Sequence, residues 1–172
     1  MPSTPEQLFS FLDRLGIAHE TTNHPPIFTA QQGQEWDDKI PGTACKSLFL
    51  KDEKGGLWLV MILADKRADL KEIAKRAGAP RFSFGKPELM LEVLGITPGS
   101  VTPFALLNDT KKRVKVVLDE DMLRCDKVHY HPLHNAASTT LRSADFLKFI
   151  QALEYEPIIV ECGQEQENNA QT

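Results

Sequence analysis

Four apolar residues near the start of the chain recur at intervals of three or four positions: Leu8, Phe11, Leu12 and Leu15. This spacing is typical of the buried face of an amphipathic helix. Thr4 and Gln7 precede it with the spacing of a capping box, and Gly16 follows it as a stop signal. The pattern therefore predicts a helix between Thr4 and Gly16.

Further segments follow in an irregular order of strand-like and helix-like patterns. Apolar runs bounded by turn residues predict strands at 47–50, 57–63, 104–107, 114–118, 127–130 and 157–160. Capped helical spacing predicts helices at 29–36, 69–77, 87–94 and 143–153. Glycine and proline predict a loop over 95–103, and residues 17–26 are expected to be irregular or extended. Without regular alternation of strand and helix, we expect a compact α+β domain with a mixed, largely antiparallel sheet and flanking helices.

Composition narrows the class of protein. The 172 residues, 41% of them hydrophobic, suffice for one domain and are few for two. A net charge of −4 argues against a protein that coats DNA, although basic residues cluster locally. No apolar run is long enough to span a membrane, and no signal peptide is expected. Three widely spaced cysteines, Cys45, Cys125 and Cys162, form no disulfide framework or metal motif, which favours a cytoplasmic protein.

The chain lacks the common fingerprints of nucleotide-binding, serine-hydrolase and zinc-protease sites. Lys46 begins an apolar strand and could bind a carbonyl or phosphate at a pocket mouth, or be a solvated edge lysine. The loop 99–103 could offer backbone groups to a ligand, or be a tight connection. Cys45 could be a nucleophile or a small buried residue. His129 and His131 share one strand face and could bind zinc, or be one pocket-facing and one structural histidine.

Four segments together carry a family resemblance: 24–26 with Thr29, 43–50, 99–103 and 131–139. They resemble the YbaK-like family, which is related to the editing insertion domain of bacterial prolyl-tRNA synthetase. The resemblance covers roughly residues 4–160 and implies a barrel-like sheet. Ser47 departs from it, because an asparagine is common at that position. We expect an editing domain over residues 1–162 and a disordered tail over 163–172.

Within this family the chain is most similar to the free-standing deacylases of Ala-tRNA(Pro). The resemblance implies hydrolysis of mischarged Ala-tRNA(Pro) in a size-selective pocket, without a covalent nucleophile, metal or cofactor. The implied partners are the alanine-bearing acceptor end of tRNA(Pro) and, transiently, prolyl-tRNA synthetase. A Cys-tRNA(Pro) deacylase of the same family, a non-catalytic nucleic-acid-binding module and a metal-dependent hydrolase are the alternatives.

The resemblance also suggests roles for single residues. Lys46 would orient the ester or the adjacent phosphate and stabilise developing negative charge. Backbone groups of the loop would position the terminal adenosine and the aminoacyl group; this loop comprises Gly99, Ser100, Val101, Thr102 and Pro103. His131 and Asn135 would shape the far wall, and the substrate's own 2′-hydroxyl would help to activate water. Basic residues would receive acceptor-stem phosphates, namely Lys71, Lys75, Arg76 and Arg81.

Overall fold

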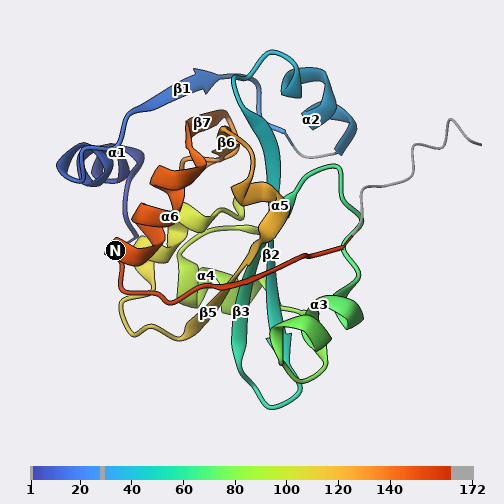
Figure 1. Cartoon of the computed structure of the whole chain (residues 1–172). Coiled ribbons are helices and arrows are strands. Elements are labelled where there is room, and N and C mark those ends of the chain that lie inside the picture. The colour runs from blue at the N-terminus through green and yellow to red at the C-terminus, as the bar shows by residue number, and fades with distance from the viewer. Residues whose placement is uncertain (1, 28–29, 164–172) are drawn as a thin grey trace, which may run out of the picture.

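The structure, a computed structural model, describes residues 2–27 and 30–163 (Figure 1). Its helices are α1 (Pro5–Arg14), α2 (Ala30–Asp37), α3 (Leu70–Ala77), α4 (Pro87–Leu94), α5 (Glu120–Leu123) and α6 (Ser143–Ala152), with 3₁₀ helices η1 (Pro98–Ser100) and η2 (Pro103–Asn108). Its strands are β1 (His19–Asn23), β2 (Thr43–Asp52), β3 (Leu57–Leu63), β4 (Phe82–Phe84), β5 (Val114–Asp119), β6 (Lys127–Tyr130), β7 (Ala137–Arg142) and β8 (Ile158–Val160).

One mixed sheet organises the domain, which confirms the predicted α+β class. Its strand order is β1-β7-β6-β2-β3-β5-β8, and β4 pairs with the far end of β2. The pairs β2–β6, β3–β5 and β5–β8 are parallel, whereas the others are antiparallel. The expected barrel-like closure is wrong. Within the described residues β1 pairs only with β7 and the three-residue β8 only with β5, so the two ends of the sheet do not meet.

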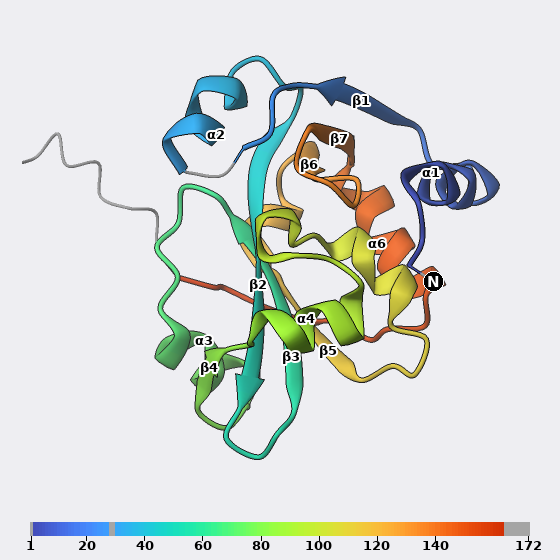
Figure 2. The same cartoon turned by 180° about the vertical axis from the view of Figure 1, so that it is seen from behind.

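Helices cover both faces of the central strands. Figures 1 and 2 show α4 and α6 on one side of β2 and β3, and α3 on the other. All seven residues of β3 are buried, because its alternate side chains enter two separate apolar clusters. The larger cluster includes residues of α1, α4 and α6, and the smaller one includes Ile73 and Ala74 of α3. The sheet is therefore a rigid central layer that fixes the ends of β2 and β3.

The predicted helix ends are confirmed where local capping chemistry determines them. In α1 the Thr4 hydroxyl accepts from the Gln7 N–H (3.2 Å), and the Gln7 side chain accepts from the Thr4 N–H (2.8 Å). Asp69 caps α3, which ends at Gly78 with a φ of 71°. Such positive φ values favour glycine, so this stop is encoded locally.

The predicted strand at 104–107 is wrong, because these residues belong to η2. Pro103 opens the helix and the Thr102 hydroxyl accepts from the Phe104 N–H (3.3 Å). A short buried apolar run suits either state, and the proline and the cap decide here. The predicted loop over 95–103 contains η1, while β4, β7 and α5 have no counterpart among the predicted elements.

Two predictions from the sequence concern residues that the structure does not describe. The proposed helix start at Thr29 and positions 164–172 of the expected tail lie outside the described residues. In the described ranges, no helix is both long and apolar enough to cross a membrane.

Candidate active site

Lys46 lies where one edge of β2 is open. On that edge β6 pairs with Thr43 and Ala44, and β4 pairs with residues 50–52. Between them, the only backbone bond in the described chain joins the Gly85 N–H to the Phe49 carbonyl (2.9 Å). Lys46 therefore lies in the part of this edge between the segments that pair with β6 and β4.

The Lys46 ammonium is half-buried and held on one side. Its Nζ donates to the Lys66 carbonyl at 2.6 Å, which leaves two N–H donors without an acceptor among the described residues. Burial lowers the pKa of Lys46, and the nearby charge of Asp65 partly opposes this effect. A desolvated cation with free donors can bind a carbonyl oxygen or stabilise an oxyanion strongly, because little water competes for it.

The loop 99–103 offers free backbone donors on a fixed frame. Thr102 and Pro103 are buried, and the Ser100 N–H donates to the Thr97 carbonyl (2.9 Å). The N–H groups of Gly99 and Val101 have no acceptor within the described part of the chain. No hydrogen bond between described residues joins this loop to Lys46, so a ligand would have to bridge the two.

His131 presents one ring nitrogen as an acceptor. Its Nδ1 lies 3.0 Å from the Ala137 carbonyl, which can only accept, so Nδ1 carries the proton. Burial lowers the pKa of His131, although the bond to Ala137 opposes this. In the resulting neutral ring Nε2 is unprotonated and can accept a hydrogen bond. The ring of His24 lies beside it, with centroids 6.2 Å apart.

Asn135 acts as a clamp in this structure. Its side-chain amide donates to the Ile27 backbone carbonyl (3.2 Å), and the Asn135 backbone carbonyl accepts from the Ile27 N–H (3.1 Å). Asn135 therefore ties the segment before α2 to the loop that precedes β7. It supports the wall that contains His131, and no bond of Asn135 to Lys46 exists among the described residues.

His129 is a buried polar group, for which the sequence left open a metal ligand or a structural or pocket-facing histidine. It is paired with Ala44 in register, so it lies on the same sheet face as Lys46. Its Nε2 is buried and has no partner among the described residues. Burial, together with the neighbouring His131 and His24, lowers the pKa of His129 to about 4. In the described ranges, no group of three or more His, Cys, Asp or Glu side chains is arranged to hold a metal ion.

Cys45 and Ser47 lie on the face of β2 opposite Lys46, because side chains alternate along a strand. Burial raises the pKa of the Cys45 thiol far above its ordinary value, so the thiol stays protonated. A protonated thiol is a poor nucleophile. The Ser47 hydroxyl is buried without a partner among the described residues.

Exposed basic side chains lie on and after α3. Lys71, Lys75 and Arg81 are exposed, whereas Arg76 is held by Glu72 (2.9 Å) and by the carbonyl of Glu161 (3.1 Å). Helix α3 packs against the sheet face on which Lys46 lies, through the cluster that includes Leu48. Among the described residues, the side chains of Lys71, Lys75 and Arg81 form no hydrogen bond or ion pair, so they can contact a ligand.

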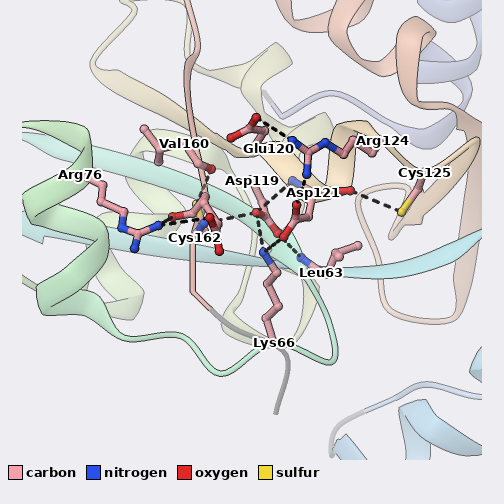
Figure 3. Close-up of polar contacts among 11 residues, drawn as sticks. Leu63, Lys66, Arg76, Asp119, Glu120, Asp121, Arg124, Cys125, Val160 and Cys162 are labelled. Carbon is pink, nitrogen blue, oxygen red and sulfur yellow. Dashed lines mark hydrogen bonds and ion pairs between the residues drawn. The ribbon is translucent and has the colours of Figure 1, made fainter. Parts of the chain in front are cut away.

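Lys66 is a buried charge that sequence analysis did not single out. It is only 1% exposed. Its ammonium lies 2.9 Å from Asp119 and 2.7 Å from Asp121 (Figure 3). The sequence held one signal for this buried pair: Asp119 directly follows the apolar run 114–118. A carboxylate that is buried with its strand needs a cation or hydrogen-bond donors as partners.

Comparison with known proteins identifies the family of the chain. The profile of the aminoacyl-tRNA editing domain family matches residues 24–149. "Prolyl-tRNA synthetase associated domain-containing protein 1" of Danio rerio is 34% identical over 157 residues, covering 90% of this chain and 85% of that protein. "Prolyl-tRNA editing protein ProX" of Acetoanaerobium sticklandii is 32% identical over 142 residues, covering 82% and 87%. A crystal structure described as a candidate trans-editing enzyme for prolyl-tRNA synthetase shares the fold, with a TM-score of 0.66, 20% identity and coverage of 95% and 99%.

The fold and the matched residues define a class of hydrolases that edit aminoacyl-tRNA. The chain belongs to the aminoacyl-tRNA editing domain family. The predicted class of enzyme, an aminoacyl-tRNA deacylase, is thereby confirmed.

Proposed function

We propose that this chain is a trans-editing enzyme that hydrolyses the ester of alanine mischarged on tRNA(Pro). The half-buried Lys46 ammonium, which has two free N–H donors at an open strand edge, carries this proposal. The relatives named for prolyl-tRNA editing support the tRNA, whereas the choice of alanine rests on the resemblance of the sequence to alanine-specific members.

In the proposed reaction a water oxygen attacks the ester carbonyl carbon. The negative charge that develops on the carbonyl oxygen is stabilised by Lys46. The bond between that carbon and the ribose oxygen then breaks, and the proton from water ends on the ribose oxygen with help from the neighbouring 2′-hydroxyl. Free alanine and tRNA are the products, and no covalent enzyme intermediate forms.

The remaining groups position the substrate. The free N–H groups of Gly99 and Val101 bind the terminal nucleotide or the aminoacyl carbonyl. The Nε2 acceptor of His131 faces the aminoacyl group, on a wall that Asn135 clamps in place. Lys71, Lys75 and Arg81 contact acceptor-stem phosphates, with a smaller contribution from Arg76, whose guanidinium is already paired.

Selection by size explains why such an enzyme is needed. A pocket shaped for proline cannot strongly exclude a smaller amino acid, because each missing methylene contributes only about 1–3 kcal/mol. A second pocket that fits alanine and clashes with the proline ring supplies the missing discrimination, since overpacking costs about 1–3 kcal/mol. We expect alanine to be hydrolysed best, serine more slowly and proline negligibly.

The test compares Lys46→Ala with Lys51→Ala, which removes an exposed lysine from the same strand. Deacylation of Ala-tRNA(Pro) is expected to fall about 10²–10³-fold in Lys46→Ala, as for the loss of an oxyanion contact. Lys51→Ala should keep wild-type turnover. A folded Lys46→Ala variant with near-wild-type turnover would remove Lys46 from the mechanism.

A substrate panel of Ala-, Cys-, Ser- and Pro-tRNA(Pro) tests the amino acid. Equal hydrolysis of alanine and proline would contradict selection by size, and a preference for cysteine would favour the Cys-tRNA(Pro) alternative. Each assay is repeated with a chelator. Activity lost on chelation and restored by zinc would favour a metal-dependent hydrolase.

A further inference from the structure

A buried ion cluster is formed by Lys66, whose backbone carbonyl binds Lys46, together with Asp119 and Asp121. Lys66 and Asp119 are 1% and 0% exposed, and Asp121 is about one-third exposed. Burial disfavours the charged form of Lys66, yet hydrogen bonds to Asp121 and Asp119 outweigh burial and raise the pKa of Lys66. The same bond to Lys66 lowers the pKa of Asp121. Lys66 and Asp121 are therefore charged together.

The cluster holds the turn that follows β3. Asp119 accepts hydrogen bonds from the N–H groups of Leu63 (3.3 Å) and Cys162 (3.2 Å), and it binds Lys66 at 2.9 Å. Figure 3 shows these bonds converging on the Asp119 carboxylate from β3, from the turn and from the C-terminal segment. The Ala64 N–H also donates to the Ala44 carbonyl (3.0 Å). The turn is thus anchored to β2, β5 and the residues after β8.

This turn ends in the acceptor that holds Lys46. The Lys66 side chain points to the carboxylates, while the Lys66 backbone carbonyl accepts from Lys46 Nζ at 2.6 Å. One residue therefore links the buried ion cluster to the ammonium at the open edge of β2. Any change that shifts the Lys66 backbone also shifts the acceptor of Lys46.

The energetics make packing alone a poor explanation for these charges. Burying an ion pair costs desolvation energy that the mutual attraction often only balances, and apolar residues of similar size can stabilise equally well. What an ion cluster adds is direction, because each hydrogen bond restricts the geometry of its partners.

We propose that Lys66, Asp119 and Asp121 are positioning residues that aim the Lys46 ammonium at the substrate ester through the Lys66 carbonyl. The catalytic part of this inference rests on the proposed function of Lys46. The structural part, the hold of the cluster on Lys46, stands without it. The two parts are therefore tested by separate measurements.

The structural part is tested on Asp121→Asn, which removes one charge of the cluster at its most exposed member. Arg124→Gln is the matched control, since Arg124 binds the same Asp121 carboxylate at 2.8 Å but does not touch Lys66. Acylation of each lysine by acetic anhydride is followed by mass spectrometry. Labelling of Lys46 is expected to rise about fivefold in Asp121→Asn, as for one lost hydrogen bond. Arg124→Gln should label as the wild type does.

The catalytic part is tested by kinetics on Ala-tRNA(Pro). Asp121→Asn should lower kcat about 10–100-fold with little change in KM, because misplacing a catalytic group affects the transition state more than binding. Asp121→Glu, which keeps the carboxylate, should restore most of kcat. A general loss of folding would instead lower the concentration of active sites, which circular dichroism and thermal unfolding of each variant measure.

The outcomes separate the two ideas. Wild-type Lys46 labelling in a folded Asp121→Asn variant overturns the positioning role. Increased labelling with unchanged kcat supports the hold on Lys46 and contradicts the catalytic role proposed for Lys46. Increased labelling with lowered kcat, restored by Asp121→Glu, supports both.

Discussion

Replacing Lys66 by Met tests how strongly the protein depends on its buried ion cluster. The change keeps an unbranched side chain of similar length and removes the ammonium that lies 2.9 Å from Asp119. Asp119 is completely buried, and in the variant no other cation among the described residues forms an ion pair with its carboxylate. We expect the variant to be markedly less stable than the wild type.

The size of the expected loss of stability depends on the hydrogen bonds that Asp119 keeps in the Lys66→Met variant. Removing one partner of a buried ion pair costs about 3–5 kcal/mol. Asp119 retains hydrogen bonds from the N–H groups of Leu63, Cys162 and Asp121, which stabilise its charge in part. The lower end of the range, about 3 kcal/mol, is therefore expected. For a chain of this length it corresponds to a fall in Tm of roughly 6–12 °C.

Urea unfolding at pH 7, followed by circular dichroism, measures this loss. Arg124→Met is the control, because it breaks two ion pairs of a side chain that is 69% exposed and should cost less than about 1 kcal/mol. The double variant Lys66→Met/Asp119→Asn should be more stable than the sum of the two single changes predicts, because the unpaired charge is gone. A Lys66→Met variant as stable as Arg124→Met would refute the reasoning.

Three further predictions concern single buried groups. Burial opposes ionisation of Asp52, but hydrogen bonds from the Trp58 indole and from backbone N–H groups, including that of Gly56, outweigh burial and lower the pKa of Asp52. The contribution of Asp52 to the free energy of unfolding is therefore present above the unfolded pKa of about 3.9, and it is lost as pH falls through the lower folded value. Asp52→Asn should cost about 1.5–3 kcal/mol at pH 7 and weaken the acid dependence of urea unfolding, whereas parallel profiles would contradict this. Cys45→Ser should keep most deacylation activity, because the Cys45 thiol stays protonated; activity at background level would indicate a covalent thiol. The pKa of His129 is lowered to about 4, so the protein becomes less stable as pH falls from about 6.5 toward that value, since the unfolded chain binds the proton first. His129→Asn should reduce this slope and leave the part due to His131, whose pKa is also lowered; an unchanged slope would assign it to other groups.

Local chemistry determined the elements that sequence analysis predicted correctly. The capping box at Thr4 and Gln7 and the cap and stop of α3 act within a few residues, so their outcome does not depend on the rest of the fold. The apolar run 57–63 is a strand as predicted, and it is buried on both faces as a continuous run suggests. The resemblance of four segments placed the chain in a family that the comparisons confirm. The roles given to Lys46, the loop 99–103, His131 and Asn135 stay predictions.

Tertiary structure decided what depends on residues far apart in the chain. The sheet stayed open, because closure requires the first and last strands to meet. Sequence alone determined which segments fold locally and which family the chain resembles. Only the fold could bring Lys66 to Asp119, 53 positions away, because a charge is buried only where a distant partner compensates its desolvation.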